Sequence, residues 1–260
     1  GGLRVLGAPD LCNRSVLVVH PANRRLRQVL LGRFGYLMGG FEMTASKLRN
    51  VLAMFTFIGM LTGCATVSLE QPKSYSTAIT DTDDTALGQD AANKAAQHGN
   101  QSGFYPLIQG MDALGTRLRL AEKAEKSIDL QYFLMKNDTA GAVIANALLN
   151  AADRGVRVRF LIDDIFTTLP DDSFLLINKH PNIEIRIFNP VSRSGIYALN
   201  FVGHFDRANR RMHNKSFTVD HSISVVGGRN IADEYFQLKE NAVFVDLDVL
   251  AVGPIAAAIS

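Results

Sequence analysis

The chain has 260 residues, enough for one large domain or two small ones, and its 47% hydrophobic and 20% charged residues exclude a disordered protein. The formal net charge of +2 is too small to indicate a nucleic-acid partner, so none is expected. The two cysteines, Cys12 and Cys64, exclude a disulfide framework, and no Cys/His cluster has zinc spacing, so we expect neither metal nor cofactor.

The segment from Met43 to Cys64 has the order of parts of a secretory signal peptide. A short basic region precedes the apolar run Val51–Met60, and Leu61-Thr62-Gly63-Cys64 closes the segment. The run is shorter than the roughly 20 residues that span a bilayer. Its closing residues resemble the lipobox of bacterial lipoproteins. That resemblance implies lipidation of Cys64 and a lipid-anchored protein of the bacterial cell envelope, on the outer membrane facing the periplasm. The alternative is a buried core helix.

Two segments beside this one are not expected to be catalytic. Residues 1–42 have no initiating Met at their start and no sustained periodicity, so we interpret them as an upstream non-native segment; a genuine basic leader is the alternative. Residues 65–103 are polar and predict a linker, with one short helix over Ala86–Gln97. The folded domain is expected over residues 104–260.

Within that domain, helical and strand patterns alternate. Apolar residues at helical spacing predict a helix over about 106–121, and Asp138 or Thr139 is expected to cap a second helix that stops at Gly155. Shorter helices are predicted over Asp172–His180 and from Pro254 onward. The predicted strands are Ser127–Leu134, Val156–Ile162, Ile183–Phe188, Ser216–Asp220, Ser222–Val226 and Ala242–Val249.

This order of elements predicts an α/β fold. Strands that alternate with helices indicate crossover units and parallel pairing, whereas no long helix separates the strands after residue 200. We therefore expect a mixed, mostly parallel sheet flanked by helices in an α/β/α sandwich. The helix that begins at Pro254 is interpreted as cut, so this domain is expected to be incomplete and one half of a two-lobed unit.

The strongest chemical signal is His213-x-Lys215 followed by Asp220, Gly227 and Asn230. Cleavage of a phosphodiester through a covalent intermediate needs a nucleophile that is neutral near pH 7, and a histidine with a pKa of about 6.5 is one. Positions i and i+2 of a strand share a face, so Lys215 is expected beside His213 as a point charge for phosphate. Gly227 and Gly228 let the backbone approach a ligand closely, and Asn230 adds a donor.

These spacings resemble the phospholipase D superfamily signature, H-x-K-x4-D-x6-G-x-x-N, at every fixed position. The resemblance implies that His213 attacks phosphorus, or protonates the leaving group if a partner histidine attacks. It also implies that Lys215, Asn230, Gly227 and Gly228 bind the phosphate and that Asp220, counted with His213 and Lys215 among the catalytic residues, anchors the framework. Gly228 is a departure, because many members carry Ser there, so one hydroxyl donor is expected to be missing.

Further stretches make the resemblance closest to the C-type cardiolipin synthases of bacteria, and to their N-terminal half. These stretches are the lipobox, Ile128–Tyr132, Gly155–Arg159, Gly227–Phe236, Asp246-x-Asp248-Val249 and Gly253-Pro254. The resemblance implies an anionic phospholipid substrate similar to phosphatidylglycerol, a membrane surface, and a second motif-bearing half, either in the same polypeptide or in a homodimer. The phosphatidyl group would be transferred through a phosphohistidine.

Two other function classes stay open. One is a homodimeric nuclease that uses the same motif, which the small net charge disfavours. The other is an inactive fragment that needs a second half. Two clusters also have double interpretations: Asp163-Asp164 as a metal site or as solvated acids, and the arginines at 207, 210 and 211 as a rim that attracts anions or as an exposed basic loop.

Overall fold

The computed structural model describes residues 44, 46–51, 53–54, 75–191, 209–240 and 244–260. The described residues before 55 belong to one compact unit and those from 75 onward to another. In the first unit, residues 46–51, 53 and 54 are helical. Within the described ranges, no helix has both the length and the apolar character needed to cross a membrane. Of the predicted signal peptide, residues 43, 45, 52 and 55–64, including Cys64, lie outside the described residues.

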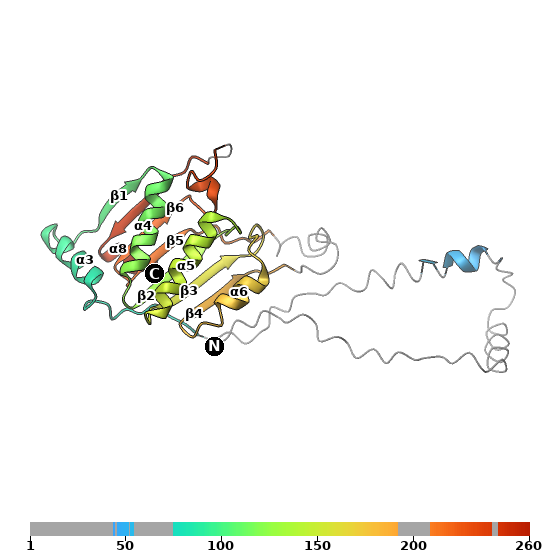
Figure 1. Ribbon diagram of the computed structural model, residues 1–260, viewed down its shortest axis with the longest axis horizontal. Coiled ribbons are helices and arrows are strands. Elements are labelled where there is room, and N and C mark those ends of the chain that lie inside the picture. Colours follow the sequence, from blue (N-terminus) through green and yellow to red (C-terminus); the bar gives the residue numbers. More distant parts are fainter. Residues whose placement is uncertain (1–43, 45, 52, 55–74, 192–208, 241–243) are drawn as a thin grey trace. The chain divides into compact units, whose positions relative to one another are not determined.

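The second unit is built on one seven-stranded sheet (Figure 1). Its strands are β1 (Gly103–Leu107), β2 (Ser127–Tyr132), β3 (Arg157–Asp163), β4 (Ile183–Phe188), β5 (Ser216–Val219), β6 (Ile223–Gly227) and β7 (Asp248–Val252). They lie in the order β1-β7-β6-β5-β2-β3-β4. Only β2–β3 and β3–β4 pair in parallel, and the other four pairings are antiparallel.

The mixed sheet of the predicted α/β fold is confirmed, but the expectation that it is mostly parallel is wrong. The prediction counted the strands joined by helices and missed β1, which pairs antiparallel with β7 at the edge of the sheet. It also placed the last strand over Ala242–Val249, whereas β7 begins at Asp248. Residues 244–247 are extended in sequence pattern yet form no strand, because the ladder with β6 ends at Gly227.

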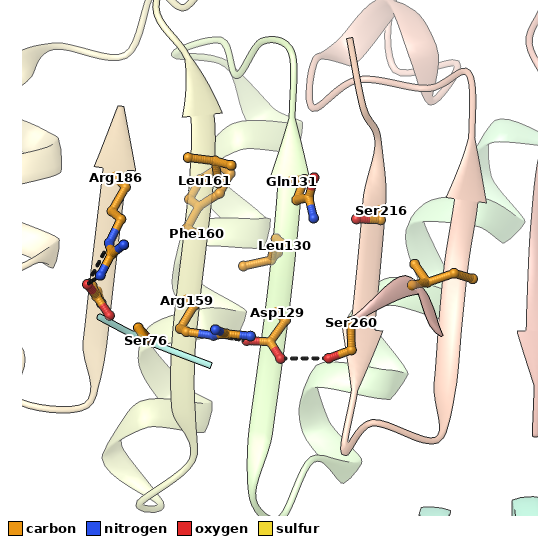
Figure 2. A pocket seen from close by; sticks show the side chains of 12 residues that line it. Ser76, Asp129, Leu130, Gln131, Arg159, Phe160, Leu161, Arg186, Ser216 and Ser260 are labelled. Atoms are coloured by element: carbon orange, nitrogen blue, oxygen red, sulfur yellow. Dashed lines mark hydrogen bonds and ion pairs between the residues drawn. The ribbon is translucent and has the colours of Figure 1, made fainter. Parts of the chain in front are cut away.

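Helices cover the sheet on both faces. They are α3 (Ala86–Gln97), α4 (Gly110–Lys123), α5 (Thr139–Asp153), α6 (Asp171–Ile177) and α8 (Pro254–Ile259), with the 3-10 turn η2 (Asp233–Tyr235). Helices α4, α5 and α6 lie over one face (Figure 1). Helix α8 packs against β5, β6 and β7 on the other (Figure 2). The sheet is therefore the middle of three layers, with helices on both of its faces.

The core side of the sheet follows that alternation. On β2, Ile128, Leu130 and Tyr132 are each 2% exposed or less, and the alternate residues of β3 and of the first part of β4 are buried with them. Helix α5 begins where Asp138 Oδ1 accepts a hydrogen bond from Gly141 N at 3.0 Å, as the sequence predicted. It is followed by Gly155, whose φ of 98° is a conformation that glycine adopts without strain.

Part of the predicted linker belongs to the fold. Helix α3 forms with the predicted bounds, and it buries Leu87, Ala91 and Ala95. Thr85 caps this helix by accepting a hydrogen bond from Gly88 N through its hydroxyl. The folded unit therefore starts well before residue 104, because the small apolar face of α3 is enough to pack against β6.

Candidate active site

Four of the motif residues, His213, Lys215, Gly227 and Asn230, lie at one end of the sheet. The parallel strands β2 and β3 end there, the antiparallel β5 and β7 begin there, and β6 ends there. Loop residues that follow or precede these strands therefore converge. The result is a site built from segments far apart in sequence, on a rigid sheet that fixes their spacing.

His213 and Lys215 share one aromatic partner, Phe133, which follows β2. The His213 ring centroid lies 4.8 Å from that of Phe133, and Lys215 Nζ lies 5.4 Å from the same ring centroid. Both residues precede β5, which begins at Ser216, so the predicted location on a strand is wrong for them, although the two are brought together. Phe133 has no polar group or spacing that could have marked it in the sequence.

His213 and Lys215 differ sharply in exposure. The histidine is exposed, whereas Lys215 is only 6% exposed and donates a hydrogen bond from Nζ to His213 O at 3.0 Å. Burial lowers the pKa of Lys215 below its usual range, and the nearby carboxylates of Asp246 and Asp248 oppose that shift. A desolvated ammonium beside an exposed imidazole suits a phosphate anion, whose negative charge compensates the burial of the cation.

Asp220 lies at the opposite end of β5 from this pair. Its carboxylate is fully buried and accepts hydrogen bonds from the backbone N–H groups of Glu125, Lys126 and Ser127 at 3.0, 2.8 and 2.9 Å. Asp220 lies five positions after Lys215, which on an extended chain is roughly 16 Å. Asp220 therefore fixes the start of β2 to the end of β5 and does not reach the His213 side chain.

The two glycines of the motif approach protein atoms, not an open ligand site. A Cβ on Gly227 would lie 2.4 Å from Leu247 O, and a Cβ on Gly228 would lie 2.0 Å from Asp246 Oδ1. The predicted close approach is present, but its partners are Asp248, the first residue of β7, and the segment just before it. A serine at 228 would require the Asp246 side chain to move.

Asn230 is 2% exposed and is held on both sides of its carboxamide. Its Oδ1 accepts a hydrogen bond from Leu134 N at 3.3 Å, and its Nδ2 donates to the Tyr235 hydroxyl at 3.0 Å. Asp233, which follows, accepts from Ala140 N at 2.7 Å and so joins η2 to the start of α5. These contacts keep the segment after β6 against the segment after β2.

The segment after β2 carries an ion pair close to the site. Lys136 Nζ contacts Glu234 Oε1, and the Glu234 side chain is 6% exposed. Burial alone would raise the pKa of Glu234, but the Lys136 ammonium outweighs it and holds that pKa below its usual range. The pair adds a second lysine beside the motif, already neutralised by a carboxylate.

The acidic pair Asp163-Asp164 is neither solvated nor arranged for a metal. Asp163 is fully buried and Asp164 is 6% exposed. Asp163 accepts hydrogen bonds from Met212 N and Arg211 Nη1, and Asp164 accepts one from Val191 N. Both expectations for this pair are therefore wrong, because backbone N–H groups and a guanidinium occupy the carboxylates. Among the described residues, no three His, Cys, Asp or Glu side chains gather as metal ligands.

The predicted anion-attracting rim is only partly described. Arg210 is exposed, Arg211 is bound to Asp163, and position 207 lies outside the described residues. Of the two, Arg210 alone has the exposure that the rim interpretation requires.

A pocket of about 240 Å³ lies on the face of the sheet away from α4 and α5 (Figure 2). Its charged side chains are paired with each other. The pairs are Arg159–Asp129 and Arg186–Glu184. Neither His213 nor Lys215 lines this pocket, and its link to the motif is Gln131, whose Oε1 accepts a hydrogen bond from Asn214 Nδ2 at 2.8 Å. We therefore place the candidate active site at the end of the sheet.

The family model described as "Cardiolipin synthase, PLD-like domain" matches residues 118–257, more than half of the chain. The chain belongs to this phospholipase D-like family. Cardiolipin synthase C of Escherichia coli is 50% identical over 160 residues, which make up 62% of this chain and 34% of that protein. The predicted resemblance to this superfamily and to C-type cardiolipin synthases is thereby confirmed.

Other relatives extend the comparison. An uncharacterized protein of Helicobacter pylori is 38% identical over 209 residues, 80% of this chain and 42% of that protein. The solved structure of NucT from Helicobacter pylori has a TM-score of 0.44 and 17% identity, covering 61% of this chain and 89% of that one. The phospholipase D-like chain thus spans less than half the length of these two curated relatives.

Proposed function

We propose that this phospholipase D-like chain transfers phosphatidyl groups between membrane phospholipids, as a cardiolipin synthase does. One observation carries the proposal: an exposed histidine and a desolvated lysine share the Phe133 ring at the end of the sheet. The pair offers a nucleophile and a cation to one phosphodiester. The 50% identity to a protein named cardiolipin synthase C supports a phospholipid substrate.

The reaction proceeds in two displacements. A ring nitrogen of His213 attacks phosphorus, the bond from phosphorus to the headgroup alcohol breaks, and a second acidic group gives that alcohol a proton. The phosphatidyl group is then attached to histidine. An acceptor hydroxyl loses its proton to the same group and attacks phosphorus, which releases the histidine. In the alternative assignment, the histidine of a second motif attacks phosphorus, and His213 gives the proton to the leaving alcohol and takes it from the acceptor.

Lys215 stabilises the negative charge on the phosphoryl oxygens in both steps. Its ammonium lies beside His213 and is itself largely shielded from water, so it stabilises the negative oxygens of the five-coordinate transition state. Asn230 holds Tyr235 and Leu134, and so fixes the loop that closes the phosphate site from the β6 side.

The mechanism needs a second acid–base group facing His213, and the proposal supplies it from a second motif-bearing half. Longer relatives support this, since the matched segment makes up 34% of cardiolipin synthase C. A second copy of this chain, paired through a two-fold axis, is the other source. Lipidation at Cys64 would hold the site at the outer membrane, on the periplasmic side, where its substrate is concentrated.

The test uses the full-length polypeptide on vesicles that contain phosphatidylglycerol labelled in the headgroup. Wild type is expected to release glycerol and form a product with two phosphatidyl groups, and His213→Ala should lose this activity while it stays folded. His98→Ala, at the exposed end of α3, is the matched control and should keep full activity. Wild-type turnover by folded His213→Ala, or cleavage of DNA in place of lipid, would contradict the proposal.

A further inference from the structure

A fully buried carboxylate at the end of β3 holds the segment that leads into His213. Asp163 Oδ2 accepts a hydrogen bond from Met212 N at 2.9 Å. Its Oδ1 accepts from Arg211 Nη1 at 3.1 Å and from Ile165 N at 3.0 Å. The carboxylate therefore binds the backbone one residue before His213 and the side chain two residues before it.

Further hydrogen bonds tie the same segment to the chain that follows β4. Arg211 Nη1 also donates to Asn189 O at 3.0 Å, and Asn189 Nδ2 donates to Arg210 O at 2.8 Å. Asp164 Oδ2 accepts from Val191 N at 2.7 Å. We call Asp163, Asp164, Asn189 and Arg211 the β3 clamp. It joins residues 189–191 and 210–212 to the end of one central strand.

We propose that Asp163 is a positioning residue for His213, acting through Met212 and Arg211. His213 lies ahead of β5, so the β5 ladder, which begins at Ser216, does not fix its backbone. Its ring rests on Phe133, and its main chain is constrained on the upstream side by the clamp. This inference rests on the proposed role of His213 in phosphatidyl transfer.

The electrostatics of the site explain why an acid fills this place. A carboxylate accepts several hydrogen bonds at once, and those from charged donors are roughly twice as strong as neutral ones. Asp163 is 0% exposed and the Arg211 side chain is 12% exposed, so water competes little for either partner. A misplacement of about 1 Å in a reacting group costs on the order of a hundredfold in rate. Loosening the clamp should therefore affect kcat more than binding.

The experiment compares three variants in the full-length polypeptide, at a temperature where all remain folded. Asp163→Ala removes every acceptor, and Asp163→Asn keeps one oxygen for Met212 N. Ile185→Val, in the core side of the neighbouring β4, lowers stability without touching the clamp. We measure kcat and KM for phosphatidylglycerol, the melting temperature, and amide hydrogen exchange of peptide 210–214.

The expected result is a graded loss of kcat. The kcat should fall about a hundredfold in Asp163→Ala and about tenfold in Asp163→Asn, while KM stays within about threefold of wild type. Exchange in peptide 210–214 should rise in the same order, and Ile185→Val should change neither quantity. The inference is overturned if both Asp163 variants keep kcat within about twofold of wild type, or if Ile185→Val loses as much kcat at an equal drop in melting temperature.

Failure of the proposed function gives a different pattern. If His213→Ala retains turnover, or wild type has none, the transfer mechanism is wrong whatever the Asp163 variants do. If in that case peptide 210–214 exchanges at the wild-type rate in Asp163→Ala, the clamp itself is also refuted.

Discussion

Replacing Lys215 by methionine separates the catalytic role of this lysine from its effect on folding. Methionine keeps the length and apolar stem of the side chain and removes the ammonium, which is buried to 6% exposure and donates to His213 O. Removal of one electrostatic donor from a water-excluded site costs about 10²–10³ in kcat, or about 2.7–4 kcal/mol. We expect a loss in that range for phosphatidyl transfer, with little change in secondary structure.

The same substitution should not destabilise the protein. Burial lowers the pKa of Lys215, so the folded state favours its neutral form more than the unfolded chain does, where lysine has a pKa of about 10.4. The charge therefore costs stability at neutral pH. That cost disappears as pH rises through the lowered pKa toward about 10.4. Relative to Lys215→Met, the unfolding free energy of wild type should rise across this interval.

Vanadate, a phosphate mimic, gives the matching binding test. Its affinity for wild type should decrease as pH rises through the lowered pKa of Lys215, because the ammonium loses its proton, and Lys215→Met should lack this decrease. Lys94→Met, which removes an exposed lysine paired with Asp90 on α3, is the control for net charge. The reasoning is refuted if folded Lys215→Met keeps more than about a third of wild-type kcat, since the expected loss is at least a hundredfold.

Three further predictions concern residues that act away from the reacting atoms. Asp220→Ala should lower the unfolding free energy by about 3 kcal/mol or more, because three backbone donors each lose their acceptor at a cost of about 1–3 kcal/mol. A variant that keeps its stability but has a reduced kcat would contradict the framework role. Gly227→Ala should be destabilised, because its Cβ would lie 2.4 Å from Leu247 O, and an unchanged denaturation midpoint would argue against this packing. Cys64→Ser should abolish palmitate labelling in a Gram-negative host; unchanged labelling would disprove the anchor.

The sequence predicted the elements whose local signals agree with their packing. Helix α5 has its cap at Asp138 and its stop at Gly155, and β4 has the predicted bounds Ile183–Phe188 because its apolar alternation matches its burial. Strand β1 was missed, since Gly103–Leu107 includes Pro106 and four exposed residues, and only its pairing with β7 makes it a strand. No local pattern records such a long-range partner.

The candidate site likewise has residues that local sequence signals predict and residues that only long-range contacts bring to it. Fixed spacing predicts roles for His213 and Lys215, because side-chain chemistry can be read from residue type. Phe133 and Asp163 were not assigned to the site, because each acts through contacts with residues about 80 and 50 positions away in the sequence. In the sequence Asp163 ends a predicted strand and is a candidate metal ligand, but in the structure its oxygens accept hydrogen bonds from Met212, Ile165 and Arg211.

The most direct test of the account is to trap the covalent intermediate during turnover. The full-length enzyme is quenched in base after milliseconds to seconds with phosphatidylglycerol, and its peptides are analysed by mass spectrometry. We predict a phosphatidyl adduct on a histidine, on His213 if it attacks or on its partner if His213 exchanges the protons, and in either case little adduct in His213→Ala. Continued turnover with no histidine adduct at any time, or an adduct formed at the wild-type rate in folded His213→Ala, would contradict the central claim.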